Sequence, residues 1–375
     1  MNFIGILKKV ITEDIPAAAF MLKRSREPFK RYNGSETQIA KKIISECFTG
    51  EFFQVSLGHF PQFYMRDFGM CVKSLCELGY TKESKLTVTY ALKNYMRENK
   101  VSTTIDSKQR CVDFFAYGPD SLAFLLHSIQ TTRCKLTESE KLFLKEQAEI
   151  CKIRVWDSKS NTVRKNTYFS SSKDHYKRNG SCYDFCMLGW ISQNLGKLGI
   201  VNPFTKINFE EELLEQYWSG EAFYDDLDKD EFSGDAQTFP FYCNILSLTK
   251  HKTYFESAIR KIGELKLDSP FPLKYTATRN KKKELFLPSL LAPNYEGDAV
   301  WIHTGLCYME IIWEFDKKLS EKYITAYRKE FEEHKNFLEV YTSTGEPYRS
   351  LVYKCDESML WISMYHNLSV KLKNR

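Results

Sequence analysis

The sequence has 375 residues, a formal net charge of +6 and an apolar content of 43%. This length and composition suit one large soluble domain with a sizeable core. The basic residues are spread along the chain, apart from a short run at 279–283. Nucleic-acid binding calls for a basic face with interleaved aromatic rings, so we do not expect nucleic acid as a partner.

Two kinds of helix alternate along the chain. Six segments carry apolar residues at intervals of three and four, which predicts helices with one buried face: 35–48, 81–99, 136–153, 207–218, 252–265 and 319–338. After each comes a segment that is apolar nearly all round and opens near an aspartate: Asp67, Asp120, Asp184, Asp235, Asp298 and Asp356. These acids lie about 50 to 65 residues apart, as in a repeat. Helices apolar on all sides belong inside, so we predict an all-α (α/α)6 toroid of six outer and six inner helices.

The aspartates at the predicted inner helices have a structural explanation that competes with a functional one. An aspartate at a helix start accepts an otherwise unpaired first-turn N–H and lies at the positive end of the helix dipole. The structural interpretation is therefore that these acids are six N-caps, and it competes with a functional role for each of them.

The alternation of helices offers no domain boundary, so we predict a single domain over residues 35–375 and an N-terminal arm over residues 1–34. The arm has no apolar stretch long enough to span a membrane, although an amphipathic anchor at residues 3–11 remains open. Loops into the inner helices are long, namely 99–118, 155–183, 218–234, 266–297 and 341–355. Long loops on a rigid scaffold commonly carry function. We expect these to gather on one face, where the inner helices converge on a central cavity.

The cysteines and histidines do not form a recognisable metal or disulfide pattern. Eleven cysteines without a CxxC pair argue against a complete disulfide framework and favour a reducing, cytoplasmic location. The histidines lie far apart, so we expect no zinc site. No glycine-rich phosphate loop follows a predicted strand, so we expect no nucleotide cofactor. The oligomeric state is left open.

Aromatic residues make up 15% of the chain, and many lie in or beside the long loops. Sugars present C–H faces to aromatic rings and hydroxyls to carboxylates, so a cavity that mixes the two suits a carbohydrate substrate, although each ring alone is also explained by core packing. The residues expected to bind it are Phe60, Arg66, Asp67, Tyr117, Asp120, Tyr183, Asp235, Glu296, Asp298, Trp301 and His303.

Three segments resemble those of trehalases and related inverting glycosidases. GHFPQFYMRDFGM (58–70) resembles the segment that opens an inner helix of their toroid. NGSCYDFCMLGW (179–190) is similar to the Ser-Gly-Trp-Asp-Phe segment that carries their general acid, and LEVYTSTGEP (338–347) resembles the segment of their general base. The order agrees, but Cys182-Tyr183 replaces Gly-Trp and the usual following arginine is missing. A relative such as an α-glucosidase or invertase-like enzyme is therefore expected rather than a trehalase.

The resemblance implies an inverting glycoside hydrolase with Asp184 as general acid and Glu339 as general base. The two carboxyl groups would lie about 6.5–9.5 Å apart. Asp184 would need a raised pKa, which its aromatic neighbours could supply by desolvation and an N-cap position would oppose. Glu296 and Asp298 are reserve candidates for the base.

Two other functions remain open at the level of sequence. A sugar epimerase or isomerase on the same fold would move the proton with histidines, of which the candidates are His59, His175, His303 and His366. A non-catalytic toroid that binds a glycan is the second, because a fold alone does not establish an activity.

Overall fold

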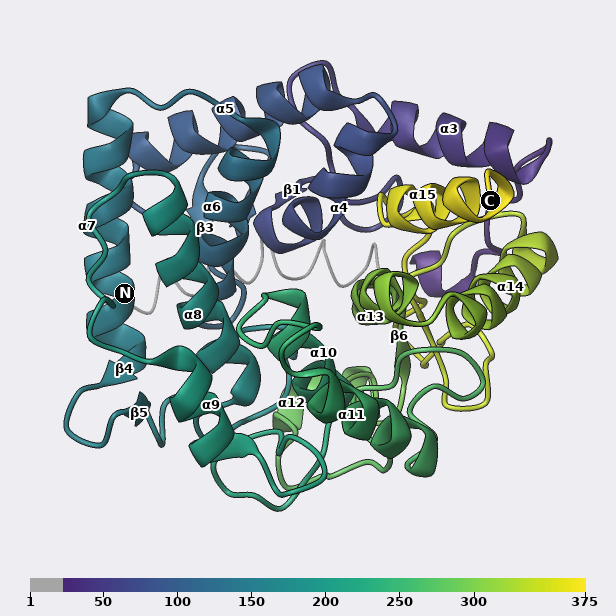
Figure 1. Ribbon diagram of the computed structural model, residues 1–375. Coiled ribbons are helices and arrows are strands. Elements are labelled where there is room, and N and C mark those ends of the chain that lie inside the picture. Colours follow the sequence, from purple (N-terminus) through teal and green to yellow (C-terminus); the bar gives the residue numbers. More distant parts are fainter. Residues whose placement is uncertain (1–22) are drawn as a thin grey trace.

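The computed structural model describes residues 23–375 and is mainly helical over that range (Figure 1). Its helices are α3 (Glu36–Cys47), α4 (Met65–Glu77), α5 (Thr81–Arg97), α6 (Asp120–Thr132), α7 (Glu138–Val155), α8 (Cys182–Lys197), α9 (Phe209–Tyr217), α10 (Gly234–Tyr242), α11 (Lys252–Glu264), α12 (Phe286–Leu291), α13 (Ile302–Phe315), α14 (Lys317–His334) and α15 (Ile362–Lys373). The predicted helical fold class is confirmed.

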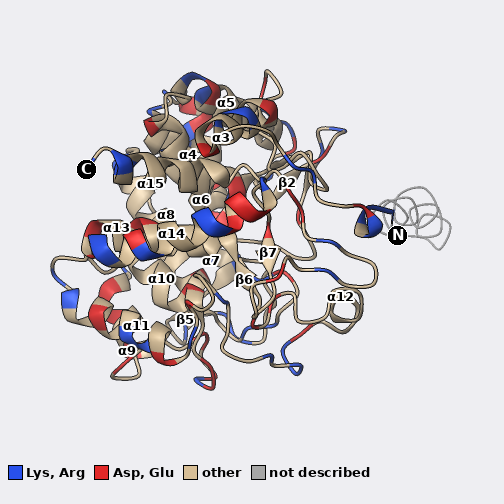
Figure 2. Ribbon diagram, turned by 90° about the vertical axis from the view of Figure 1, so that its right-hand side faces the viewer, with Lys and Arg blue, Asp and Glu red and all other residues tan. Residues whose placement is uncertain are grey.

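Some of the loops contain short strands that pair with one another. In residues 23–375 they are β1 (Phe63–Tyr64), β2 (Thr104–Ile105), β3 (Cys111–Val112), β4 (Trp156–Asp157), β5 (Thr162–Val163), β6 (Val300–Trp301) and β7 (Val340–Tyr341). They form three small antiparallel sheets, β1-β2-β3, β4-β5 and β6-β7. Strands β2, β6 and β7 lie with α12 to one side of the helices (Figure 2).

Six of the helices correspond to the amphipathic segments predicted from the sequence: α3, α5, α7, α9, α11 and α14. Local capping explains where two of them begin. Ser35 and Gln38 form a capping box at α3, and Thr137 and Glu140 form another at α7. In each box a side chain pairs an N–H that the helix leaves open at its first turn. These six helices lie at the periphery of the view in Figure 1.

The predicted inner helices are α4, α6, α8, α10, α13 and α15, and each contacts the next. Helix α4 packs on α6, α6 on α8, α8 on α10, α10 on α13, α13 on α15, and α15 returns to α4. Many of their residues on all sides belong to one continuous buried apolar cluster. This explains why the sequence of these segments shows no polar face.

The aspartates are not the N-caps of these helices, contrary to the expectation from the sequence. The N-cap residues of α8 and α10 are Ser181 and Ser233, whose hydroxyls accept first-turn N–H groups at 3.0 and 3.3 Å. The other N-caps are Tyr64, Pro119, Trp301 and Trp361. Four of the acids lie inside the first turn of a helix, where they still face its positive end, while Asp298 and Asp356 precede the N-cap.

Helices α4 and α6 pack closely because Gly69 has no side chain. A Cβ atom at Gly69 would collide with the side chain of Phe124. We expect Gly69→Ala to lower the free energy of unfolding by about 1–3 kcal/mol through overpacking, although alanine is the better helix former. Urea unfolding measures this change.

Gly263 in α11 provides the control for that experiment. A Cβ at this glycine would meet nothing within 4 Å. Gly263→Ala should therefore raise the free energy of unfolding by about 0.5–1 kcal/mol. Equal effects of the two substitutions would contradict the packing described for α4 and α6.

The predicted N-terminal arm is described in part. Residues 1–22 lie outside the described residues, and with them the segment 3–11. Of the remainder, the Arg24 guanidinium pairs with Glu357 at 2.8 Å, and the Tyr32 N–H donates to the Lys335 carbonyl at 2.9 Å. The division into an arm and one domain stays a prediction. Within residues 23–375, no helix has both the length and the apolar character needed to cross a bilayer.

Candidate active site

A cavity of about 640 Å³ lies among the loops that lead into the inner helices. Its volume is within the range of about 300–1,000 Å³ typical of ligand sites. The charged and imidazole side chains in its lining are Arg66, Asp67, Asp174, His175, Glu296, His303 and Glu339. Aromatic rings accompany them: Phe60, Tyr64, Phe114, Phe115, Tyr295, Trp301, Tyr353 and Trp361. The cavity thus combines carboxylates with rings, as predicted for a sugar site.

Glu339 is brought to the cavity by the pairing of β6 with β7. Trp301 pairs with Val340, so the residue before β7 lies beside the start of α13. The hydroxyls of Tyr295 and Tyr353 donate to the two Glu339 oxygens at 2.8 and 2.7 Å. Burial, with the nearby charge of Asp356, raises the pKa of the Glu339 carboxyl to about 7.

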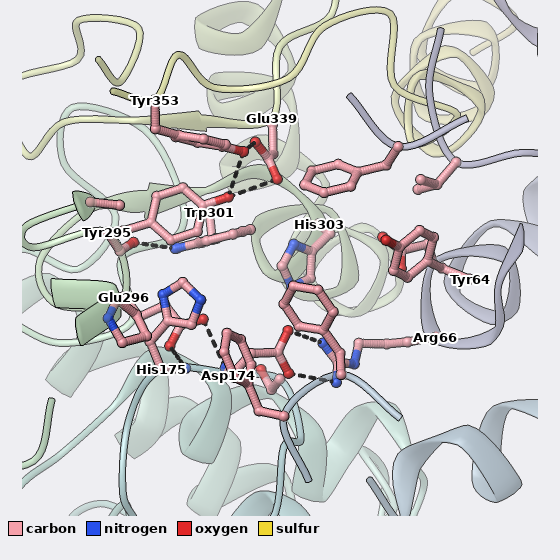
Figure 3. A pocket seen from close by; sticks show the side chains of 18 of the residues that line it. Tyr64, Arg66, Asp174, His175, Tyr295, Glu296, Trp301, His303, Glu339 and Tyr353 are labelled. Atoms are coloured by element: carbon pink, nitrogen blue, oxygen red, sulfur yellow. Dashed lines mark hydrogen bonds and ion pairs between the residues drawn. The ribbon is translucent and has the colours of Figure 1, made fainter. Parts of the chain in front are cut away.

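Asp174 lies on the other side of the cavity from Glu339 in the view of Figure 3, next to Arg66. The two guanidinium NH2 groups donate to the two carboxylate oxygens at 3.2 and 3.1 Å, and the Ser170 hydroxyl donates at 2.7 Å. Burial acts to raise the pKa of Asp174, but the Arg66 charge and these hydrogen bonds hold it below its ordinary value. Asp174 is therefore ionised in the free protein.

Glu296 fixes the loop that carries Asp174. One carboxylate oxygen accepts the backbone N–H of Asp174 at 2.7 Å, and the other accepts the backbone N–H of His175. Burial, the largest influence, raises the pKa of Glu296. Because both oxygens are already bound to backbone, Glu296 acts chiefly as the anchor of this loop.

Asp67 and His303 complete the polar lining. The indole N–H of Trp361 donates to Asp67 at 3.0 Å, and burial raises the pKa of this carboxyl to about 7. Burial, together with the charge of Arg66, lowers the pKa of His303 to about 3. His303 is therefore neutral at pH 7, and its Nε2 lies 3.2 Å from the hydroxyl of Tyr275.

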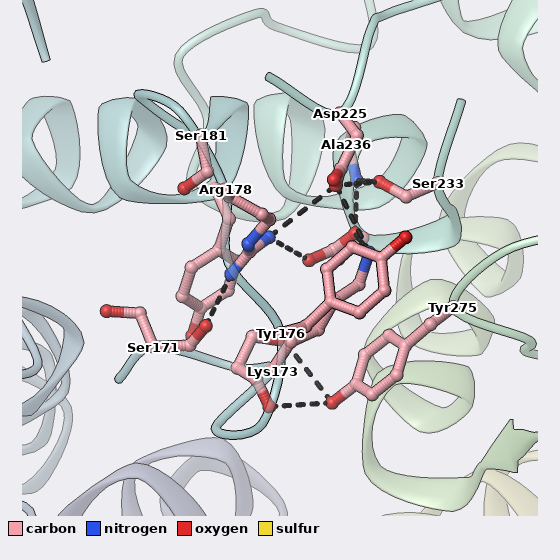
Figure 4. Close-up of polar contacts among 12 residues, drawn as sticks. Ser171, Lys173, Tyr176, Arg178, Ser181, Asp225, Ser233, Ala236 and Tyr275 are labelled. Atoms are coloured by element: carbon pink, nitrogen blue, oxygen red, sulfur yellow. Dashed lines mark hydrogen bonds and ion pairs between the residues drawn. The ribbon is translucent and has the colours of Figure 1, made fainter. Parts of the chain in front are cut away.

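A buried ion cluster, outside the cavity lining, includes Lys173 and Arg178 of the loop that carries Asp174 (Figure 4). The Lys173 ammonium lies 3.2 Å from Asp225 and 3.8 Å from Asp235, and the Arg178 guanidinium lies 2.8 Å from Asp235. Burial acts to raise the pKa of Asp225, but Lys173 and Arg178 lower it to about 2. Charges removed from water are stable only when paired, so the cluster holds residues 173–178 in one conformation.

The structure brings together about half of the residues predicted for the site. Those that line the cavity are Phe60, Arg66, Asp67, Glu296, Trp301, His303 and Glu339. Those that do not line it are Tyr117, Asp120, Tyr183, Asp184, Asp235 and Asp298.

Most residues of the second group have other partners. Asp120 accepts a hydrogen bond from the Arg66 guanidinium at 2.5 Å and another from the Tyr183 hydroxyl at 3.2 Å, so the two position Arg66 from outside the cavity. Asp298 pairs with the Asn294 amide, and the Tyr117 ring lies 5.0 Å from the Arg154 guanidinium carbon.

Asp184, the acid predicted by resemblance, is buried at the start of α8. Its carboxylate accepts the Ser181 hydroxyl at 2.6 Å, while its N–H donates back to the same hydroxyl. Burial raises its pKa to about 6, against the influence of Arg178. The pKa is thus in the range that a general acid needs, but the side chain is not part of the cavity lining.

Several lining residues were not singled out from the sequence, namely Asp174, Tyr353 and Trp361. Asp174 lies in the polar run SSSKDHYKR, inside the long loop that precedes α8. A charged residue within such a loop is a signal that could have found it.

Of the histidines considered for proton transfer, His175 and His303 line the cavity, whereas His59 and His366 do not. Within residues 23–375, no group of three or more His, Cys, Asp or Glu side chains is placed to hold a metal ion.

No protein-family model matches the sequence, and no curated protein matches it. Several solved structures are nevertheless similar. The GH63 mannosylglycerate hydrolase from Thermus thermophilus, in complex with Tris and D-glycerate, has a TM-score of 0.59 at 9% identity, over 90% of this chain and 100% of that one. The rhamnosidase from Klebsiella oxytoca with rhamnose bound has a TM-score of 0.62 at 10% identity, over 94% of this chain and 67% of that one.

A glycosidase variant in complex with glucose has a TM-score of 0.65 at 10% identity, over 95% of this chain and 98% of that one. At identities this low, the similarity of the structures shows that the fold is shared. The chain therefore has the mainly helical fold of these glycosidases, as the resemblance seen in its sequence predicts.

Proposed function

We propose that the protein is a glycoside hydrolase that cleaves a small glycoside inside an (α/α)6 toroid. The closed series of contacts from α4 to α15 supports the toroid. The observation that carries the function is the placement of Asp174 and Glu339 in one cavity, apart from each other and among aromatic rings (Figure 3). The names of the similar solved structures support the same activity.

In the proposed mechanism, Asp174 is the general acid and Glu339 the general base. Asp174 donates its proton to the glycosidic oxygen as the bond from that oxygen to the anomeric carbon breaks. Glu339 takes a proton from a water molecule, whose oxygen bonds to the anomeric carbon from the opposite face. One water is consumed, and the products are an alcohol and a sugar of inverted configuration.

This assignment requires a proton to change place when substrate binds. In the free protein the pKa values put the proton of the pair on Glu339 rather than on Asp174. Arg66 is the reason, since its charge favours ionised Asp174. A sugar whose hydroxyls bind Arg66 would weaken the pairing of Arg66 with Asp174. Hydrogen bonds in an active site often take their catalytic geometry only when the substrate is bound.

Sugar release from a panel of α- and β-linked glycosides tests the proposal. The wild type should release one sugar, and Glu339→Gln should release it about 10²- to 10⁴-fold more slowly, the usual contribution of a general base. Asp184→Asn is the matched control, because this carboxylate is buried but does not line the cavity. Equal loss in both variants, or no release by the wild type, would contradict the proposal.

The pH dependence of kcat/KM follows from the single proton that Asp174 and Glu339 together must hold. Glu339 has its pKa raised to about 7 and Asp174 has its pKa lowered, so the free enzyme carries one proton on the pair between these values. Above pH 7 that proton is lost. We expect kcat/KM to fall about tenfold for each pH unit above 7.

Asp67 also has a pKa of about 7, so the Asp67→Asn variant is the control for the pH profile. Its residual activity should show the same decline above pH 7. A kcat/KM that rises with pH through 7 in the wild type would contradict the shared proton.

A further inference from the structure

Part of the cavity lining is apolar and open to solvent. We call it the apolar wall; it consists of Phe114, Phe115, Leu287, Pro288, Leu291, Ala292 and Val352. Three of its side chains are strongly exposed, with 54% for Phe115, 64% for Leu287 and 48% for Leu291. Exposed apolar side chains that gather at a cavity mark a contact site for an apolar partner.

The part of the apolar wall formed by Phe114 and Phe115 has an unusual backbone conformation and contacts the His175 ring. Phe115 has a φ of 63°, in the left-handed region that bulky residues seldom adopt. Its ring meets the His175 ring edge to face at 5.1 Å and the Phe114 ring at 4.6 Å. Strain of this kind persists where the surroundings impose it, and it gathers at functional sites.

The α12 part of the apolar wall is tied to loops on both sides of the cavity. The Leu285 N–H donates to the His175 carbonyl at 2.7 Å, just before α12. The Ser350 hydroxyl donates to the Leu291 carbonyl at 2.7 Å, at its other end. The segment is therefore a fixed wall of the cavity, with Leu287 and Leu291 in the lining and Phe286 and Leu290 outside it.

Both parts of the apolar wall are connected to His175, the residue that follows the proposed general acid. His175 follows Asp174 in the chain, and it contacts Phe115 through its ring and Leu285 through its carbonyl. In the proposed mechanism Asp174 protonates the leaving oxygen, so the aglycone lies on the side of Asp174. A hydroxylated aglycone would leave unpaired polar groups against this surface, which is unfavourable, whereas an alkyl or aryl chain would bury apolar area.

We infer that the apolar wall binds the aglycone and that the substrates are glycosides of hydrophobic alcohols, alkyl or aryl. This inference rests on the proposed glycoside hydrolase function. The sugar lies among the polar lining residues Arg66, Asp67 and Glu339, and the chain of the alcohol lies along Phe115 and α12.

The test compares methyl and octyl glycosides of the sugar that the panel identifies, with the octyl glycoside kept below its critical micelle concentration. A fully buried methylene improves binding by about fourfold, so partial burial of an octyl chain should raise kcat/KM by about tenfold or more over methyl. In the double variant Leu287→Ser/Leu291→Ser this octyl-to-methyl ratio should fall at least about fivefold, because the chain loses its apolar contacts.

The control is the double variant Phe286→Ser/Leu290→Ser, on the same short helix. These side chains are 81% and 65% exposed and lie outside the cavity lining. The octyl-to-methyl ratio should remain that of the wild type. An octyl preference that survives Leu287→Ser/Leu291→Ser, or one that both double variants lose equally, would overturn the inference.

A second measurement separates this inference from the proposed function. Calorimetric titration of octyl and methyl glycosides into the same variants reports binding without turnover. Equal cleavage and equal binding of the two glycosides would overturn the role of the apolar wall and leave the glycosidase proposal standing. Octyl binding that depends on Leu287 and Leu291, without cleavage of any glycoside, would support the apolar wall and overturn the hydrolase.

Discussion

Asp174→Asn should lose about 10²- to 10⁴-fold in kcat on an alkyl glycoside, yet retain most of its activity on a dinitrophenyl glycoside of the same sugar. The alkyl alcohol is a poor leaving group that needs a proton from Asp174, whereas dinitrophenolate leaves without one. The geometry supports this selective effect, since the Asp174 carboxylate lines the cavity with its Arg66 partner.

The pH profile of the same variant should also reverse. On the dinitrophenyl glycoside, Asp174→Asn requires no acid and needs only ionised Glu339. Its kcat/KM should therefore rise as pH increases toward the Glu339 pKa of about 7, whereas the wild type on alkyl glycosides declines above it. Steady-state kinetics from pH 4 to pH 9 measures both profiles.

Asp67→Asn is the matched comparison for the acid assignment. Asp67 lines the same cavity and has a pKa raised by burial to about 7, so its pKa suits a proton donor better than that of Asp174. If Asp67→Asn, and not Asp174→Asn, shows recovery with the activated leaving group, the acid is Asp67 and the assignment of Asp174 is wrong. Equal loss of both variants on both substrates would show that neither donates the proton.

Asp235→Ala should lower the free energy of unfolding by about 3–5 kcal/mol, the cost of breaking a buried ion pair from one side. The change leaves Lys173 and Arg178, both almost wholly buried, with Asp225 as their remaining partner in the cluster. Two buried cations then share one carboxylate, so one positive charge is removed from water without compensation. Urea unfolding followed by circular dichroism measures the loss.

An exposed ion pair gives the control for this large effect. Lys141 lies 2.8 Å from Glu138 on α7, and the Glu138 side chain is 90% exposed. Lys141→Ala should change the free energy of unfolding by less than about 1 kcal/mol, because solvent screens such pairs. An Asp235→Ala variant as stable as Lys141→Ala would contradict the structural role of the buried cluster.

The outer helices could be predicted because their signal is local. Segments such as 136–153 carry the three- and four-residue apolar spacing in their own sequence, and Thr137 with Glu140 marks the start of α7. The sequence pattern does not predict helix α12. It has only six residues inside a long loop, too few for a periodic pattern, and its ends are fixed by loops distant in sequence.

The site residues that a local sequence segment identifies could be predicted. Those whose position depends on contacts between distant parts of the chain could not. The resemblance of a short segment predicts Glu339, which lies in the cavity lining. Asp174 and Asp184 are ten residues apart, and the resemblance pointed to the second. Which of them reaches the cavity depends on the loop before α8, whose path is set by Glu296 and by the buried Lys173, contacts that no local pattern shows.

The most direct test of the central claim is the configuration of the sugar at the moment of its release. Proton NMR of the wild type acting on a glycoside of known anomeric configuration, recorded before mutarotation, gives the answer. The proposed pair of Asp174 and Glu339 predicts that the first product has the inverted configuration, and that Glu339→Gln forms almost none of it. First release of the retained anomer would contradict the assignment of Glu339 as a base that activates water.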